Sequence, residues 1–181
     1  ESLVALDIET GVRKWHYQMI HHGIWDRDVS CAGVICDIPH KGKIIKAFAQ
    51  PTKQGFVYVL DRTNGKPVWP IPEKPVPKGD VPGEWYTPTH PFPSAPPPFA
   101  KQGMTVNDLV DWTPQIKARA LEIASHYHIG GLYDPPPLVN DKIFGMLNLP
   151  GLQGGINWPG ASYDPETHML YLFAKNQIEV T

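Results

Sequence analysis

The sequence lacks the features that mark a membrane-spanning or a nucleic-acid-binding protein. Its longest apolar runs, such as residues 56–60, are the length of a strand and too short to cross a bilayer. Its 16 Lys and Arg residues are scattered and offset by 18 Asp and Glu residues, so no basic stripe is available for a phosphate backbone. We therefore expect no membrane span and no nucleic-acid partner. With 41% hydrophobic residues, the composition is typical of a globular protein.

Cysteine is also scarce, because Cys31 and Cys36 are the only two. In an extended segment their offset of five residues puts the side chains on opposite faces, so we predict no disulfide between them. The CxxxxC spacing alone is not a metal-binding motif. Both cysteines are interpreted as small, buried apolar side chains.

The chain has no initiator Met and no leader of charged and then apolar residues, because Glu1 leads directly into an apolar stretch. Its last residues, 171–181, stop just after a predicted strand. These ends predict an internal segment of a longer protein, whose targeting signal lies elsewhere. Such a segment should expose unpaired strand edges and apolar faces.

The most informative feature that is present is a repeat. The stretch ALDIETGVRKW at residues 5–15 recurs as VLDRTNGKPVW at residues 59–69, with the same Asp-to-Gly and Gly-to-Trp spacings. Residues 163–171 form a third, weaker copy. Trp15 and Trp69, which close the first two copies, are interpreted as packing residues.

Each copy predicts a strand, a tight turn and a second strand. Asp7 and Asp61 can accept hydrogen bonds from the turn amides, and Gly11 and Gly65 suit a corner with positive φ. His168 takes the place of this Gly in the third copy, and His is enriched in the same left-handed region. Three such hairpins predict consecutive blades of a β-propeller, each packed against its neighbours.

The remaining segments complete an all-β prediction. Strands are expected near residues 31–38, 43–49 and 56–60, whereas residues 70–98 are too rich in Pro for regular sheet. We therefore predict a partial β-propeller, made of consecutive blades of an eight-bladed ring, with a Pro-rich insertion and one short helix. The predicted organisation is a single domain over residues 1–181, with hairpin repeats near residues 3–19, 55–69 and 158–174 and an insertion over residues 70–145.

The short helix is predicted over residues 114–124. Thr113 is a suitable N-cap and Pro114 suits the first helical position. The apolar residues Ile116, Ala120 and Ile123 share one helical face. We expect this helix to have a packing role rather than a catalytic one.

Candidate functional residues gather after the first hairpin, in HHGIWDRD at residues 21–28, and 27 positions beyond Asp26, at Lys53. Asp26 and Asp28 are two residues apart, so in an extended backbone both carboxylates project to one side and could share a cation. The structural alternative is that Asp26 caps a turn, Trp25 fills a gap and Lys53 is a solvated charge. Spacing alone does not choose between the two.

The order of these motifs over residues 5–69 resembles that of the pyrroloquinoline quinone (PQQ) dependent quinoprotein dehydrogenases. The stretches PEKPVPKG at residues 72–79 and TPTHPF at residues 87–92 are most similar to the membrane-bound glucose dehydrogenase branch. A looser similarity covers GGINW at residues 154–158 and YDP at residues 163–165.

The resemblance implies roles for individual residues. Asp26 is the catalytic base, which takes the proton of the substrate hydroxyl while a hydride passes to the quinone. Lys53 contacts the quinone oxygens, and Asn157 and Trp158 lie at the rim of the same pocket. Asp28 joins Asp26 as a metal ligand, and the metal polarises the quinone carbonyl.

The resemblance also implies which metal is bound and which parts of the cofactor site this chain does not contain. The metal is expected to be Ca²⁺, with another divalent ion or a lanthanide as the alternative. In the family, the remaining Glu and Asn ligands and the ring that stacks on PQQ come mostly from segments that precede the equivalent of Glu1. We therefore expect the isolated chain to be inactive.

The combined prediction is part of a PQQ-dependent dehydrogenase that oxidises a glucose-like aldose or another alcohol. Electrons would pass to ubiquinone or a cytochrome, and the protein would be periplasmic, anchored to the inner membrane by a segment outside this chain. The main alternative is a non-catalytic propeller scaffold that mediates protein–protein interaction. A sugar-binding or hydrolase module is a third alternative, but Asp26 and Asp28 are too close in sequence for the usual acid and base on either side of a glycosidic bond.

Overall fold

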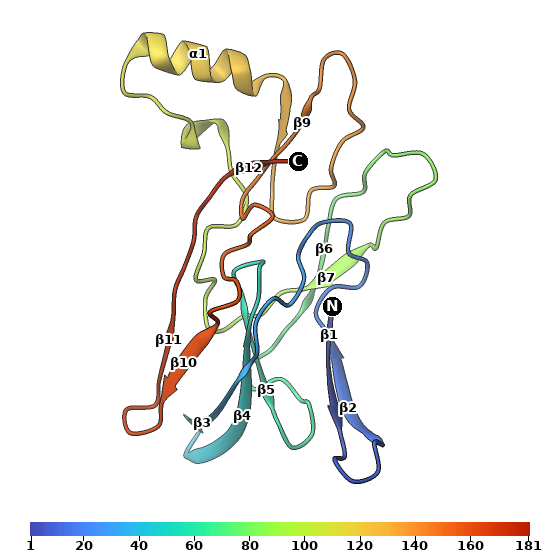
Figure 1. The fold of residues 1–181 in the computed structure, drawn as a ribbon, viewed down its shortest axis with the longest axis vertical. Coiled ribbons are helices and arrows are strands. Elements are labelled where there is room, and N and C mark those ends of the chain that lie inside the picture. Colours follow the sequence, from blue (N-terminus) through green and yellow to red (C-terminus); the bar gives the residue numbers. More distant parts are fainter.

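The computed structural model describes all residues 1–181 and contains five small sheets and two short helical segments (Figure 1). The all-β prediction is confirmed, and no sheet closes on itself. The first and third predicted hairpin regions contain the pair β1 (Ser2–Leu6) and β2 (Arg13–Gln18) and the pair β10 (Ala161–Asp164) and β11 (Met169–Leu172). The second region contains one strand, β5 (Val57–Asp61), which forms a sheet with β4 (Lys43–Pro51) and β3 (Val34–His40). The second strand predicted for this copy is reduced to a single bridge between Leu60 and Pro67.

The repeated turn chemistry is confirmed in all three copies. A carboxylate oxygen of Asp7, Asp61 and Asp164 accepts a hydrogen bond from the backbone N–H two residues further on, at 3.2, 2.8 and 2.9 Å respectively. The corner residues adopt the left-handed conformation, with φ of 69° at Gly11, 74° at Gly65 and 57° at His168. Local sequence therefore sets the three turns in the same way.

The closing tryptophans pack as predicted. The Trp15 ring lies against the second turn so closely that a Cβ atom at Gly65 would stand 2.7 Å from it. Its indole N–H also donates to the Arg62 carbonyl at 3.0 Å. Trp69 packs beside the β3–β4–β5 core and meets His40 edge-on, with ring centroids 5.6 Å apart. Trp15 thus joins the first hairpin to the turn of the second.

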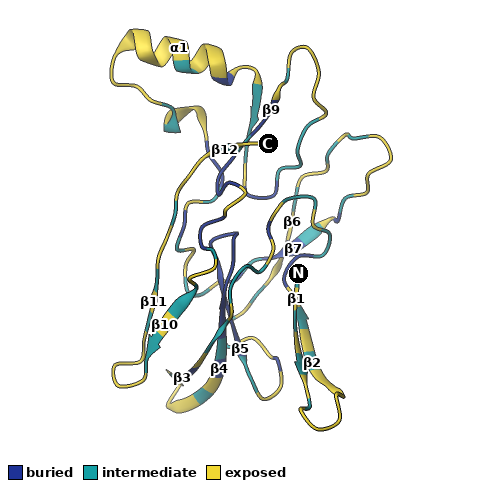
Figure 2. Ribbon diagram, in the orientation of Figure 1, coloured by how far each residue is buried: buried dark blue, intermediate teal, exposed yellow.

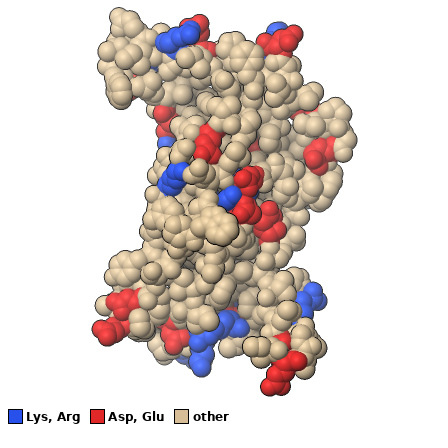
Figure 3. Space-filling model, in the orientation of Figure 1, with Lys and Arg blue, Asp and Glu red and all other residues tan.

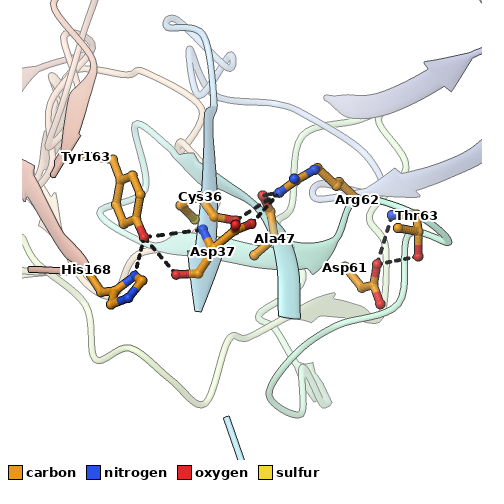
Figure 4. Close-up of polar contacts among 8 residues, drawn as sticks. All are labelled: Cys36, Asp37, Ala47, Asp61, Arg62, Thr63, Tyr163 and His168. Carbon is orange, nitrogen blue, oxygen red and sulfur yellow. Dashed lines mark hydrogen bonds and ion pairs between the residues drawn. The ribbon is translucent and has the colours of Figure 1, made fainter. Parts of the chain in front are cut away.

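Polar contacts join the second repeat to the third (Figure 4). Arg62 donates to the Cys36 carbonyl at 3.0 Å and pairs with the Asp37 carboxylate at 3.1 Å. On the other side of the same strand, the Tyr163 hydroxyl donates to the Asp37 carbonyl at 2.7 Å and accepts from the Asp37 N–H at 3.4 Å. The His168 ring nitrogen Nδ1 lies 2.7 Å from the same hydroxyl. Strand β3 is therefore held from both sides.

The core lies on the two faces of β5, where residues 56–60 are all buried (Figure 2). Phe56 and Tyr58 face one apolar cluster, whereas Val57 and Val59 face the other. This alternation is that of a strand covered on both sides. Because this strand follows directly on the turn that holds Lys53, the most buried part of the chain also fixes a candidate functional residue.

Both cysteines are free, as predicted, but their environments differ. Cys36 is buried in the β3–β4–β5 core, whereas Cys31 is only half-buried and precedes β3. The prediction that both are fully buried was therefore wrong for Cys31. Its thiol lies 3.7 Å from the Pro51 carbonyl, beside the turn that leads to β5.

The Pro-rich insertion contains more sheet than predicted. The strands β6 (Glu73–Pro75) and β7 (Thr89–Pro91) pair as an antiparallel ribbon. The hydrogen bonds beside this ribbon use non-proline donors: Val76 donates to the Pro88 carbonyl and Phe92 to the Pro72 carbonyl. The exclusion of regular sheet was wrong because proline tolerates an edge position where its missing N–H is not needed.

A second unpredicted sheet follows the insertion. The strands β8 (Tyr127–Ile129) and β9 (Gly145–Asn148) run parallel, and β12 (Glu179–Val180) pairs with the other edge of β9. A short 3₁₀ helix, Val106–Asp108, precedes this region. Three-residue strands with few neighbours leave little periodicity for a sequence-based prediction.

The helix α1 (Pro114–Ala124) has the predicted bounds, and the Thr113 hydroxyl accepts from the Ile116 N–H at 3.2 Å. The helix contacts β8 and buries Ala124, but its predicted apolar face is not covered, because Ile116 and Ile123 are exposed. In Figure 1 the helix lies at the end of the molecule opposite the β1–β2 hairpin. No helix in the structure has the length and apolarity needed to cross a bilayer.

The molecular surface combines exposed apolar residues with interspersed charges. Val4, Leu6 and Ile8 are exposed on the first hairpin, in agreement with the expected uncovered apolar faces. On the face shown in Figure 3, acidic and basic side chains alternate over a mostly uncharged surface. No single-sign patch dominates this view.

Candidate functional site

The structure brings Asp26, Asp28 and Lys53 together. The two carboxylates lie on the connection between β2 and β3, and Lys53 lies in the turn between β4 and β5. The Lys53 Nζ atom donates to Asp26 Oδ1 at 3.1 Å and to Asp28 Oδ1 at 2.5 Å. The predicted convergence of Asp26 and Lys53 is therefore present in the fold. We call these three residues the acid–lysine cluster.

A tight turn positions Lys53. The Thr52 N–H donates to the Phe56 carbonyl at 2.9 Å, and Gly55, with φ of 85°, donates to the Thr52 carbonyl at 2.9 Å. The positive φ explains why glycine stands at this corner. The turn joins two buried strands, so the position of the Lys53 side chain is fixed by the core.

The cluster is asymmetric in exposure. The Lys53 side chain is 7% exposed, whereas the side chains of Asp26 and Asp28 are 53% and 55% exposed. Burying a lone ammonium is unfavourable, so the two carboxylates compensate a charge that the fold holds away from water. The oxygens remain accessible on their outer side.

The charges of the cluster stabilise one another. Burial alone would lower the pKa of Lys53, but its hydrogen bonds to Asp28 and Asp26 raise that pKa above the ordinary value of 10.5. Burial alone would raise the pKa of Asp28, yet the hydrogen bonds with Lys53 and Asp26 leave that pKa below the ordinary value of 3.8. At neutral pH Lys53 is therefore an ammonium and Asp28 a carboxylate.

Two glycines that precede the third repeat lie against Lys53. Gly155 donates its N–H to the Lys53 carbonyl at 2.8 Å. Gly154 lies so close that a Cβ atom there would overlap the Lys53 side chain, and its φ of 72° also favours glycine. This contact explains the GGINW stretch physically, as a close approach of backbone to a buried lysine.

Asn157 and Trp158, expected at the rim of the pocket, form no hydrogen bond with the acid–lysine cluster. Asn157 donates to the Gln153 carbonyl at 3.0 Å and accepts from the Trp158 N–H at 2.8 Å. The Trp158 side chain projects to solvent, since the residue is 85% exposed. Their role toward a cofactor stays a prediction.

The donor set fits part of a metal site. Asp26 and Asp28 provide carboxylate oxygens, the ligand type that Ca²⁺ prefers, on the same side of one loop. No group of three or more His, Cys, Asp or Glu residues is arranged to hold a metal ion. The two residues therefore supply an incomplete ligand set.

Aromatic contacts hold the loop that contains Asp26. The Trp25 indole N–H donates to the Asp134 carbonyl at 2.8 Å, and its ring meets Tyr133 edge-on at 5.5 Å. Tyr133 in turn stacks on His90 at 4.4 Å. Burial lowers the pKa of His90 to about 4, so this ring is neutral at physiological pH.

Sequence reasoning missed Arg27, which lies between the two carboxylate residues. Arg27 is 2% exposed, forms no ion pair and leaves its Nη1 atom without a hydrogen-bond partner. Burial lowers the pKa of Arg27 to about 10, although Tyr133 and Asp26 oppose this effect. The only indication in the sequence was the position of this arginine between two aspartates in HHGIWDRD, and that pattern is equally typical of an exposed loop.

The comparisons with known proteins identify the family of the chain. All of residues 1–181 match the protein family described as "Glucose/ethanol/alcohol dehydrogenase, beta-propeller domain", under the heading PQQ. The chain belongs to the family of PQQ-dependent dehydrogenases. The resemblance inferred from the motifs is thereby confirmed, as is the propeller fold.

Similar quinoproteins differ in their named substrates. The chain is 34% identical to the glycerol dehydrogenase large subunit of Gluconobacter oxydans, over 93% of this chain and 22% of that protein. It is 35% identical to the quinoprotein glucose dehydrogenase of Escherichia coli K12, over 91% of this chain and 20% of that protein. The chain thus spans about a fifth of the length of these quinoproteins.

A solved quinoprotein structure shows the same arrangement of strands. The quinohemoprotein alcohol dehydrogenase of Comamonas testosteroni superposes with a TM-score of 0.55 and 26% sequence identity, over 98% of this chain and 20% of that one. Because the match covers nearly all of this chain, the short sheets described above are those of a quinoprotein propeller.

Proposed function

We propose that this chain is the part of a PQQ-dependent dehydrogenase that provides the catalytic base and a cofactor-binding lysine. The substrate is an aldose or another alcohol, and the electrons pass to a quinone or a cytochrome. The enzyme works in the periplasm, with any membrane anchor outside this chain. The observation that supports the proposal is the contact of buried Lys53 with the half-exposed carboxylates of Asp26 and Asp28.

Asp26 is the proton acceptor in this proposal. Its Oδ1 atom receives a charge-assisted hydrogen bond from Lys53, which orients the carboxylate, while the side chain remains about half exposed to an incoming hydroxyl. A carboxylate held in this way can accept the proton of a substrate hydroxyl. Lys53 needs no freedom of its own, because the turn and the glycines behind it fix its position.

The family implies a cofactor and a metal ion. When bound, PQQ supplies the two-electron oxidant, and Ca²⁺, another divalent ion or a lanthanide supplies an electrophile. Lys53 would contact the quinone, Asp26 and Asp28 would provide metal ligands, and Asn157 and Trp158 would lie at the rim. The buried ammonium and the pair of carboxylate oxygens suit an electron-rich cofactor and a hard cation respectively.

The acid–lysine cluster favours an enzyme over a non-catalytic propeller scaffold. The hairpins and their tryptophans are sufficient for a scaffold, which gains nothing from a lysine that is 93% removed from water. Desolvation of Lys53 costs free energy that Asp26 and Asp28 offset, and buried charge clusters of this kind are typical of functional sites. The scaffold therefore explains the repeats but leaves the cluster unexplained.

Reconstitution of the full-length protein tests the proposal. The apoprotein is mixed with PQQ and Ca²⁺, and reduction of an artificial dye is followed against a panel of sugars and alcohols. We expect dye reduction with at least one substrate, and none when PQQ is omitted. Binding of PQQ without dye reduction by any substrate would contradict the proposed activity and favour the scaffold.

A further inference from the structure

A small cavity beside Asp26 is lined in part by groups that the proposed mechanism does not use. Its volume is about 100 Å³, and its lining includes Asp26, Arg27, Asn148 and the apolar side chains of Ile24 and Trp25. This volume exceeds that of one water molecule, whose share of the liquid is ~30 Å³. The cavity is therefore the size of a functional group or a very small molecule.

Arg27 gives this cavity a positive charge that forms no ion pair. The residue is 2% exposed, forms no ion pair within the chain and has an unpartnered Nη1 atom. A buried guanidinium normally pairs with a carboxylate or phosphate, which matches its planar set of donors. The Asp26 carboxylate acts on Arg27 through its charge but forms its ion pair with Lys53, and no other carboxylate of the chain pairs with Arg27.

Asn148 adds a free acceptor to the same wall. It is 5% exposed, and its Nδ2 atom is already engaged with the Thr181 hydroxyl, so its Oδ1 atom has no partner. A buried carbonyl without a donor is unfavourable unless a ligand provides one. A hydroxyl group on a bound molecule would satisfy it.

We propose that this cavity binds a carboxylate group through Arg27, beside the base Asp26. The proposal rests on the proposed function, because it names the class of ligand that the same site takes. The carboxylate comes from either of two sources: a hydroxy-acid substrate or the carboxylates of PQQ itself. The free acceptor of Asn148 adds a place for a ligand hydroxyl, which a hydroxy acid provides.

A ligand carboxylate bound at Arg27 would position the substrate hydroxyl next to Asp26. Asp26 lines the cavity and is also a member of the acid–lysine cluster. A short hydroxy acid with its carboxylate at Arg27 would therefore bring a neighbouring hydroxyl to Asp26. The apolar walls of Ile24 and Trp25 lower the local dielectric constant and so strengthen the contact with Arg27.

The test uses glycerate and glycerol, which share a three-carbon skeleton and differ in one carboxylate. Binding of each to the full-length holoprotein is measured by titration calorimetry, and PQQ binding to the apoprotein by a fluorescence titration. The variants are Arg27→Met, Asn148→Asp, which places a negative charge in the cavity, and the control Arg119→Met on the exposed face of α1.

We expect Arg27→Met to weaken the binding of one carboxylate ligand by about 10- to 100-fold, the usual range for a hydrogen bond to a charged group. If only the affinity for glycerate falls, the carboxylate that Arg27 binds is that of the substrate. If only the affinity for PQQ falls, it is that of the cofactor. Asn148→Asp should weaken the binding of the same ligand. If Arg27→Met does not fold, this second variant alone tests whether the cavity binds a carboxylate. The Arg119→Met control should bind both ligands as the wild type does.

Unchanged binding of both glycerate and PQQ in Arg27→Met and Asn148→Asp would overturn the inference. So would a wild-type protein that neither prefers glycerate to glycerol nor depends on Arg27 for PQQ. These readouts need no turnover. A protein that oxidises nothing but loses carboxylate binding in Arg27→Met would refute the proposed function alone.

Discussion

The ammonium nitrogen of Lys53 lies 3.1 Å from a carboxylate oxygen of Asp26, although 27 residues separate them in the chain. Two connections produce this contact: the loop after β2 and the turn between β4 and β5. The first connection joins two sheets, whereas the second is a turn within the β3–β4–β5 sheet. The site is thus a product of the repeat, since neither connection alone would hold both charges.

Removal of the Lys53 charge should impair the site more than the fold. In Lys53→Met the two carboxylates lose their shared cation while the apolar stem of the side chain is kept. We expect the affinity of the full-length protein for PQQ to fall by at least about tenfold, the loss of a charge-assisted contact. A fluorescence titration with PQQ measures this, with the exposed Lys43→Met on β4 as the matched control. Equal PQQ affinity in the two variants would remove Lys53 from cofactor binding.

Stability should fall in mild acid because of His90. Burial lowers the pKa of this ring from 6.5 to about 4 in the folded protein. Between these values the unfolded chain binds a proton that the folded chain does not, so the free energy of unfolding decreases as the pH falls from 6.5 toward 4. The loss attributable to His90 amounts to at most about 3 kcal/mol.

His90→Phe should remove this part of the pH dependence while it keeps a ring against Tyr133. Urea unfolding at a series of pH values measures the effect, and His16→Phe, at an exposed position on β2, is the control. If His90→Phe and the wild type lost stability in parallel between pH 6.5 and 4, another group would be responsible.

Tyr163→Phe should loosen the contact between the second and third repeats. The substitution deletes the hydroxyl that bonds to both the carbonyl and the N–H of Asp37 and lies near His168. We expect the free energy of unfolding to fall by about 1–2 kcal/mol, since each bond contributes ~1 kcal/mol and Asp37 loses its partner. Chemical denaturation measures this. Tyr171→Phe, which removes an exposed hydroxyl, should leave the free energy of unfolding almost unchanged. Equal stability of the two variants would show that the Tyr163 hydroxyl does not stabilise the fold.

Local sequence predicted those parts of the fold that local chemistry determines. The Asp and the left-handed corner residue of each turn, Gly11 or His168, act within five residues, so the hairpins at residues 2–18 and 161–172 were predictable. The same holds for α1, where Thr113 and Pro114 determine the start of the helix. Asp26 and Lys53 were identified from the order of motifs, which preserves information about contacts distant in sequence.

The parts that escaped prediction depend on tertiary contacts. The parallel pairing of β8 with β9 joins two strands of three and four residues, too short to show a period. The apolar face of α1 predicts packing, yet the helix, which contacts β8, leaves Ile116 and Ile123 exposed. The burial of Arg27 is likewise invisible in sequence, because an arginine between two aspartates has the composition of a surface loop.

The central claim is that Asp26 is the base of a PQQ-dependent dehydrogenase. It is tested most directly by the turnover of Asp26→Asn in the full-length protein, reconstituted with PQQ and Ca²⁺ and compared with Asp111→Asn, an exposed aspartate ahead of α1. We predict that dye reduction with the best substrate falls by about 10²- to 10⁴-fold in Asp26→Asn, the usual effect of losing a general base, and is unchanged in Asp111→Asn. Undiminished turnover in Asp26→Asn with PQQ bound would contradict this assignment.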